Sequence, residues 1–253
     1  MITLILLCIA GFVAAFIDAI AGGGGLISVP AFLMAGIPPH LTLGTNKFCA
    51  TSGSITSVIK FAKSGKINFK LLKSLLPFTF LGSILGVIVV GFIPADSLSG
   101  IVLILVLFIG IYTIFSKDLG VEEKKVIITK KIILIGMLFA FGLGFYDGFF
   151  GPGTGSFLIF GLIGIFGQDF TKATANAKLL NVTSNISALI MFAIKGQIIY
   201  KIAIPVAICM ALGARVGTRI AIDNGPKLIK PIFIIMSLAV AIKLIYPYLI
   251  KLL

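Results

Sequence analysis

The chain has 253 residues, of which 59% are hydrophobic and only 11% are charged, and its net charge is +13. Soluble domains carry about 25% charged residues, so this composition excludes an ordinary soluble protein and indicates a polytopic membrane protein. The positive charge does not indicate nucleic-acid binding, because most lysines lie between apolar runs and no basic stripe is interleaved with aromatic residues. Cys8, Cys49 and Cys209 lie on apolar segments, so we expect no disulfide framework, no metal site and no cofactor.

Glycine, proline and charged residues divide the chain into ten apolar segments. The predicted segments are 2–19, 25–36, 41–63, 69–93, 97–116, 131–149, 154–166, 171–195, 199–221 and 227–250. The second and the seventh are short, and as helices they cover only about 18 Å of a hydrocarbon core that is about 30 Å thick. We therefore predict half-helices or re-entrant pieces at these two places in an all-α membrane fold.

The chain consists of two halves with matching interruptions. The glycine break Gly22–Gly25 follows Asp18, and a second break, Gly151–Gly155, follows Asp147, 129 residues further along the chain. Glycine and proline interrupt helices, because glycine lacks a Cβ atom and proline lacks an N–H donor. Paired breaks in two halves of a membrane protein indicate a substrate site between the halves.

A second set of matches supports this repeat at an offset of 131 residues. The pair Gly82-x-x-x-Gly86 recurs as Gly213-x-x-x-Gly217, and we interpret both pairs as places where two helices pack closely. The predicted organisation is a first transmembrane repeat at 1–116, a linker at 117–130 and a second transmembrane repeat at 131–253.

Lysine and arginine residues predict the orientation of the segments. Basic residues gather between 60 and 73, between 117 and 131, and between 215 and 230, whereas none occurs from 74 to 116. The positive-inside rule places these three basic regions in the cytoplasm and the turn at 94–96 outside. The turn after the ninth segment is then inside while its counterpart in the first half is outside, so we predict inverted repeats of five segments each.

The breaks and the polar residues near them indicate a site for an anion. A helix that starts inside the membrane exposes backbone N–H groups and a partial positive charge, and both attract anions. Lys47 and Lys178 each follow an asparagine early in a long apolar segment, and a lysine inside a membrane marks a transport pathway, pairs with a partner or snorkels to the surface. Asn181 and Asn185 extend the polar face beyond Lys178, so we expect the second half to make the more selective contacts.

Asp18 and Asp147 leave three roles open: pairing with one of the two lysines, binding the freed backbone amides, or carrying protons. Tyr146 is expected either to line the pocket or to be a buried tyrosine with one hydrogen bond. An intramembrane aspartyl protease would also use two aspartates, but neither aspartate follows a Gly-x-Gly sequence. A passive anion channel remains a second alternative, because it requires polar lining residues without coupling or alternating access.

The motifs around both breaks resemble those of the TauE/SafE family of sulfite and organosulfonate exporters. The resemblance rests on Asp18–Gly25 and Gly44–Lys47 in the first half, and on Tyr146–Gly155 and Ala173–Lys178 in the second. It spans nearly the whole chain and implies export of small sulfur-containing anions across the plasma membrane of a prokaryote by a multi-pass protein. Proton coupling and assembly as a homodimer are left open.

The predicted mechanism is alternating access around a site lined by both breaks and both asparagine–lysine clusters. The partners that we expect are a small anionic substrate and the lipid bilayer. The predicted substrate-binding residues are Gly22, Gly23, Gly24, Gly25, Thr45, Asn46, Lys47, Tyr146, Gly151, Gly153, Thr154, Asn176, Lys178, Asn181 and Asn185, with Asp18 and Asp147 as coupling or structural carboxylates.

Overall fold

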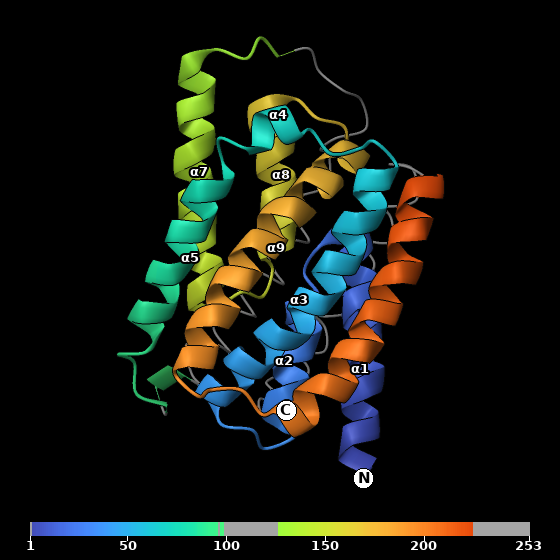
Figure 1. The fold of residues 1–253 in the computed structure, drawn as a ribbon, viewed down its shortest axis with the longest axis vertical. Coiled ribbons are helices and arrows are strands. Elements are labelled where there is room, and N and C mark those ends of the chain that lie inside the picture. The colour runs from blue at the N-terminus through green and yellow to red at the C-terminus, as the bar shows by residue number, and fades with distance from the viewer. Residues whose placement is uncertain (1, 96, 99–125, 225–253) are drawn as a thin grey trace, which may run out of the picture.

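A computed structural model describes residues 2–95, 97–98 and 126–224, and every regular element in this part of the chain is an α-helix (Figure 1). The helices are α1 (Ile2–Ala21), α2 (Gly25–Met34), α3 (Pro39–Lys63), α4 (Phe69–Leu72), α5 (Leu76–Val90), α7 (Lys130–Phe149), α8 (Thr154–Phe166), α9 (Phe170–Ile194) and the helix Tyr200–Asn224. Four of them, α1, α7, α9 and Tyr200–Asn224, are long and apolar enough to cross a membrane. The all-α, multi-pass prediction is confirmed.

The two glycine breaks each form the tip of a helical hairpin. In Figure 1, α1 rises from the N-terminus to the middle of the molecule, and α2 turns back toward the end where α1 begins. α7 descends from the opposite end to the middle, and α8 returns toward that end. The two short helices contain 10 and 13 residues, which confirms the prediction of short segments after both breaks.

The fourth predicted segment, 69–93, is wrong as a single helix. The structure divides it into α4 and α5, with a turn at 73–75 between them. Pro77 causes the division, because it has no N–H for a bond to the preceding turn and is therefore tolerated only in the first turn of α5. The predicted segments 97–116 and 227–250, and most of the linker 117–130, lie outside the described residues.

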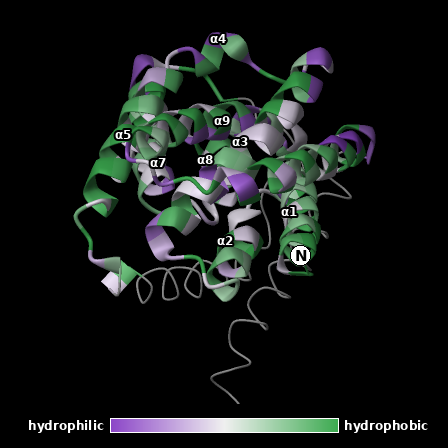
Figure 2. Ribbon diagram, turned by 60° about the horizontal axis from the view of Figure 1, so that its bottom comes forward, coloured by the Kyte–Doolittle hydropathy of each residue, from purple (hydrophilic) through white to green (hydrophobic). Residues whose placement is uncertain are grey.

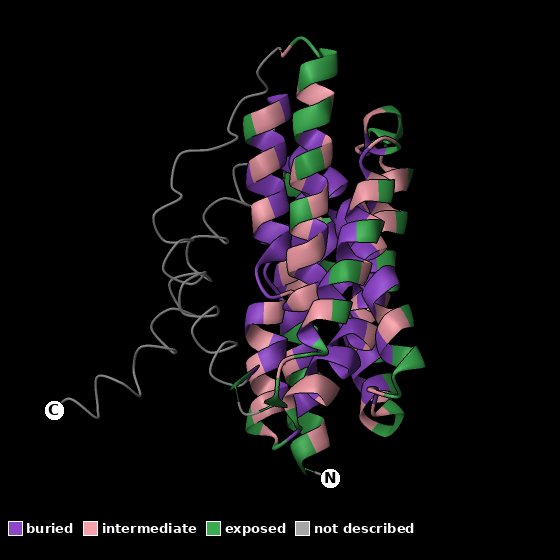
Figure 3. Cartoon of the chain, turned by 90° about the vertical axis from the view of Figure 1, so that its left-hand side faces the viewer, coloured by how far each residue is buried: buried purple, intermediate pink, exposed green. Residues whose placement is uncertain are grey.

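The distribution of polar residues is the reverse of that in a soluble domain. Large apolar side chains on the outer faces of α1 and α7, such as Leu6 and Leu138, are more than half exposed. Figure 2 shows hydrophobic residues along α1 and α5, with hydrophilic residues at helix ends and in the interior. Figure 3 shows that the buried residues form the middle of the bundle, and α3 and α9 contribute many of them. Apolar outer faces around a polar interior suit a bilayer as the surrounding solvent.

Two pairs of glycines bring helices from different halves into contact. Gly82 and Gly86 lie so close to backbone atoms of α7 that an added Cβ atom at either position would overlap with them. Gly213 and Gly217 lie in the same way against the backbone of α1. Close helix packing, the role predicted for these glycines, is confirmed.

The packing of one half is repeated in the other with the sequence offset found above. The carbonyls that face Gly82 and Gly86 belong to Phe141 and Phe145, which lie 129 residues after the phenylalanines that face the second glycine pair. Equivalent helices also run in opposite directions in Figure 1, where α1 begins at the bottom and α7 begins at the top. An inverted repeat requires this arrangement and remains our prediction.

Candidate functional site

The tips of the two helical hairpins meet in the middle of the molecule. Gly22 faces the backbone of Gly155, and Gly25 faces Pro152. Gly22 and Gly153 have φ values of 74° and 83°, in the left-handed region that favours glycine. Residues with a Cβ atom would be strained at both turns, and at Gly22 that atom would lie 2.5 Å from the backbone of α8. The absence of side chains therefore allows the breaks to touch.

Two ion pairs join the halves beside these tips, one of them fully buried and the other with a partly exposed carboxylate. Lys47 Nζ on α3 lies 2.9 Å from Asp147 Oδ2 at the end of α7, and Lys178 Nζ on α9 lies 2.5 Å from Asp18 Oδ2 on α1. Each lysine therefore pairs with the aspartate of the other half. Of the three roles that the sequence left open, the structure shows pairing for both aspartates, and Asp18 also binds a freed backbone amide, since its Oδ1 accepts a hydrogen bond from Gly24 N.

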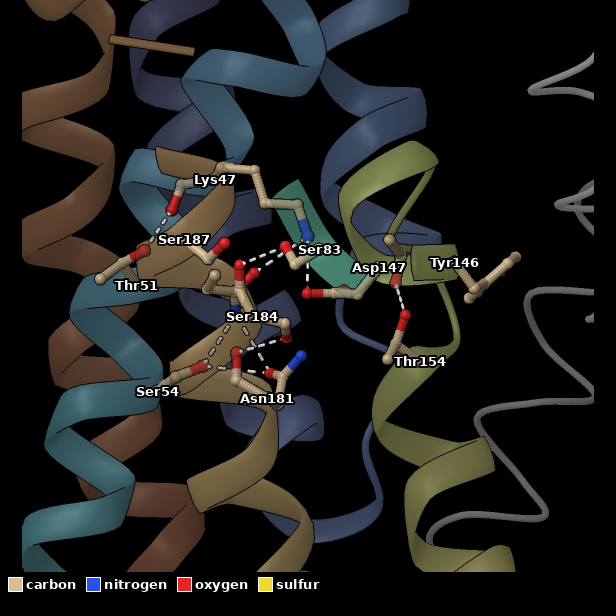
Figure 4. Close-up of polar contacts among 12 residues, drawn as sticks. Lys47, Thr51, Ser54, Ser83, Tyr146, Asp147, Thr154, Asn181, Ser184 and Ser187 are labelled. Carbon is tan, nitrogen blue, oxygen red and sulfur yellow. Dashed lines mark hydrogen bonds and ion pairs between the residues drawn. The ribbon is translucent and has the colours of Figure 1, made fainter. Parts of the chain in front are cut away.

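A polar network on α3 and α9 continues from Lys47 (Figure 4). Its ammonium group donates a hydrogen bond of 3.0 Å to Asn185 Oδ1. Asn185 in turn donates to Asn181 Oδ1 over 3.2 Å, and Ser54 donates to the same oxygen over 3.3 Å. The network orients the lysine toward Asp147 and provides amide groups on the facing side of α9.

A cavity of about 40 Å³ lies between the hairpin tips and this network. The predicted residues that line it are Asp18, Gly23, Gly24, Gly25, Asn46, Lys47, Asp147, Gly151, Gly153, Asn181 and Asn185. Asn46 is 5% exposed, and its side-chain oxygen has no hydrogen-bond partner among the described residues. This oxygen is a hydrogen-bond acceptor and is available to water, whereas the Nδ2 group of the same amide is the donor that an anion would require.

Several predicted binding residues lie outside this cavity and form structural contacts instead. The Thr45 hydroxyl accepts a hydrogen bond from Ile199 N, and Asn176 Oδ1 accepts one from Asn68 N. Lys178 reaches Asp18 without lining the cavity. Gly22, described above, contributes the contact between the breaks.

Tyr146 and Thr154 stabilise the turn between α7 and α8. The Tyr146 hydroxyl donates to Pro152 O over 2.7 Å, and the Thr154 hydroxyl donates to Gly151 O over 2.7 Å. Figure 4 shows the Tyr146 ring on the side of α7 opposite to Asp147. Of the two roles expected for Tyr146, the structure shows the one with a hydrogen bond, although the ring is half-buried and not fully buried as expected.

The cavity also has lining residues that the sequence did not single out for binding. They are Ala14, Ala15, Ser28, Ala50, Gly53, Gly155 and Met210. Gly155 belongs to the second break and could have been included from the motif. The alanines, Ser28 and Met210 resemble ordinary helix residues, and only the packing of α1, α2, α3 and Tyr200–Asn224 brings them to the site.

Comparison with known proteins places this sequence in a family. The family model described as sulfite exporter TauE/SafE matches residues 7–244. The chain belongs to the TauE/SafE family. It is therefore a member of a membrane transporter family and a multi-pass membrane protein of the bacterial type.

Individual relatives match over nearly their whole length. The chain is 40% identical to a probable membrane transporter protein of Haemophilus influenzae, over 96% of this chain and 94% of the relative. It is also 40% identical to the probable membrane transporter protein YfcA of Escherichia coli K12, over 97% and 92%. A more distant relative, the probable membrane transporter protein YdhB of Bacillus subtilis, is 23% identical over 95% and 98%. No solved structure matches this chain significantly.

Proposed function

We propose that this protein exports small sulfur-containing anions, with sulfite as the best candidate, by alternating access and with proton coupling. The observation that carries the proposal is the buried ammonium group of Lys47, which faces a cavity between two helix breaks. Helix starts and glycine backbone provide N–H groups for oxyanions, and the lysine provides a positive charge.

The size of the cavity favours a small anion. Its volume of about 40 Å³ is room for about three water molecules, since each requires about 10–15 Å³ in this measure. An ion of one sulfur atom and three oxygens is of similar size, whereas a sulfonate with an organic tail would require the cavity to widen. Sulfite is therefore our first choice of substrate.

Two equivalent contacts between the halves support alternating access. Asn176 Oδ1 accepts from Asn68 N over 2.8 Å, and Thr45 Oγ1 accepts from Ile199 N over 3.1 Å, with each acceptor and each donor separated from its counterpart by 131 residues. Each bond ties the beginning of one long helix, α9 or α3, to the loop after the other. In Figure 1 these helices begin at opposite ends of the molecule. Breaking one of these hydrogen bonds while the other stays formed would expose the cavity to one side only.

A larger cavity near α4 supports export from the cytoplasm. It has a volume of about 790 Å³ and is lined by Lys66, Lys70 and Lys172, with Asn176 among its other lining residues. Lys66 and Lys70 lie in the region 60–73, which the positive-inside rule assigns to the cytoplasm, and Lys172 lies in the first turn of α9 on the same cavity. A basic cavity on that side raises the local concentration of anions before they reach the inner site.

A binding screen on the purified full chain tests the substrate. Sulfite, sulfoacetate, taurine, thiosulfate, sulfate and phosphate are compared by calorimetry at several pH values, and we expect sulfite to bind most tightly. Asn46→Ala should weaken binding by at least about tenfold, because it removes the Nδ2 donor and one hydrogen bond to a charged group contributes about 1.5–3 kcal/mol. No binding by any of these anions, or equal binding of all six, would contradict the proposed site.

Transport in liposomes separates a carrier from a channel. In alternating access, unlabelled sulfite on one side accelerates the efflux of labelled sulfite from the other side, because the loaded site returns faster than the empty one. A passive channel shows no such acceleration. Asn46→Ala liposomes serve as the matched control for leakage, and an efflux without acceleration would favour the channel.

A further inference from the structure

The two ion pairs occupy equivalent positions in the halves but have different surroundings. Lys47 and Asp147 both line the inner cavity, whereas in the other pair only Asp18 does. An anion in the cavity can therefore contact the ammonium group of Lys47 directly. Lys178 is 1% exposed and lies behind its carboxylate partner.

The two carboxylates also differ in how they are held. Asp18 has two partners, because Oδ2 contacts Lys178 and Oδ1 accepts a hydrogen bond of 3.2 Å from Gly24 N. Asp147 Oδ2 contacts Lys47 at 2.9 Å, but among the described residues no donor of good hydrogen-bond geometry reaches this oxygen. Asp18 is thus anchored to the first break, whereas Asp147 depends on the charge of Lys47.

We infer that Lys47–Asp147 is the pair that opens for the substrate, with the anion replacing Asp147 at Lys47 and Asp147 taking up one proton. The proton comes from water and binds a carboxylate oxygen, and Lys47 keeps its own proton throughout. When the anion is a monoanion, such as hydrogensulfite or methanesulfonate, one negative charge enters with it and one is neutralised on Asp147, so the charge of the site does not change. The inference rests on the proposed function and assigns its coupling step to one residue.

Within the described part of the chain, the helices packed around Asp147 provide no other cation to hold its charge. α5 and α8 contain no ionisable side chain. α3 contributes Lys47, and the nearest lysine of α9 to the site, Lys178, is already paired with Asp18 of α1. A buried carboxylate without a partner is unfavourable and becomes protonated instead. Asp18 would keep the Gly24 amide, and its side chain is 23% exposed against 2% for Asp147.

Two isosteric variants at equivalent positions test this inference on the purified full chain. Asp147→Asn leaves Lys47 without a counter-charge. The thermal unfolding midpoint of this variant should therefore fall in anion-free buffer and recover when sulfite is added. Asp18→Asn should also lower the midpoint, but sulfite should restore it no more than it stabilises the wild type. Equal responses of the two variants to sulfite, or no response of Asp147→Asn, would overturn the inference.

Methanesulfonate tests the proton, because this monoanion has no titratable group near neutral pH. Its dissociation constant for the wild type should rise tenfold for each pH unit, since one proton is taken up on binding. Asp147→Asn should abolish this dependence, whereas Asp18→Asn should keep it. A slope that persists in Asp147→Asn would overturn the assignment.

Double variants keep the test decisive if a lone buried charge prevents folding. Lys47→Gln with Asp147→Asn removes both charges of one pair and should lose the response to sulfite and to pH. Lys178→Gln with Asp18→Asn removes the other pair and should retain both responses, whatever its absolute affinity. The opposite pattern would overturn the inference.

These results are distinguishable from a failure of the proposed function. Suppose that the wild type binds none of the anions, but that sulfite stabilises Asp147→Asn and not Asp18→Asn. The assignment of Lys47–Asp147 as the pair that opens then stands, and the proposed substrate is wrong. If the wild type binds sulfite and both aspartate variants respond to it alike, the substrate stands and the assignment of Lys47–Asp147 is wrong.

Discussion

The contact between the two glycine breaks can be tested by adding one methyl group to Gly22. Gly22→Ala would introduce two separate penalties. With φ at 74°, an alanine adopts a left-handed conformation that costs about 1–2 kcal/mol. Its Cβ atom would also lie 2.5 Å from Gly155 C and Ser156 N, and overpacking of this kind costs about 1–3 kcal/mol. We expect a total destabilisation of about 2–5 kcal/mol.

Gly36→Ala is the matched control for this prediction. Gly36 has a similar φ of 79°, but an added Cβ atom there would meet nothing within 4 Å. Its substitution should therefore cost only the backbone penalty of about 1–2 kcal/mol. The measurement is the thermal midpoint and the unfolding rate of both variants in one detergent. If Gly22→Ala is no less stable than Gly36→Ala, the breaks do not touch as described.

Three further predictions concern the packing, the turn and the two ties. Gly86→Ala should lower stability by about 1–3 kcal/mol in the same thermal assay, because its Cβ atom would overlap with the backbone of α7. As a control, Gly142→Ala places its Cβ atom in open space and should be neutral or stabilising. Tyr146→Phe should cost about 0.5–1.5 kcal/mol through one lost hydrogen bond and leave sulfite affinity unchanged in calorimetry; a loss of affinity would place the ring in the site after all. Thr45→Val and Asn176→Leu each remove one of the two hydrogen bonds between a long helix and the opposite loop. In oriented vesicles, each variant should increase thiol labelling of a cysteine placed at the cavity, and the two variants should do so from opposite sides of the membrane. Increased labelling from the same side in both variants would refute the proposal that each hydrogen bond closes one side.

The sequence alone was sufficient for the class and the breaks, whereas the inverted repeat stays a prediction. An apolar chain with few charges has only one solvent in which its helices can expose their outer faces, and glycine-rich interruptions at matched places mark helix ends whatever surrounds them. The close packing of the Gly-x-x-x-Gly pairs follows from the same local logic, since small residues let two backbones approach. The division of the fourth segment could also have been predicted from Pro77, although the continuous apolar run favoured a single segment.

Only the tertiary structure decided which residues share the site. Pairing across the halves, Lys47 with Asp147 and Lys178 with Asp18, depends on how α3 and α9 cross. The sequence favoured the second half for selective contacts, because more polar residues follow Lys178. In the structure the cation that faces the cavity comes from the first half, whereas Asn176 binds a loop. Spacing along one helix determines which side chains share a face, but the partner opposite that face is set by packing between segments more than a hundred residues apart.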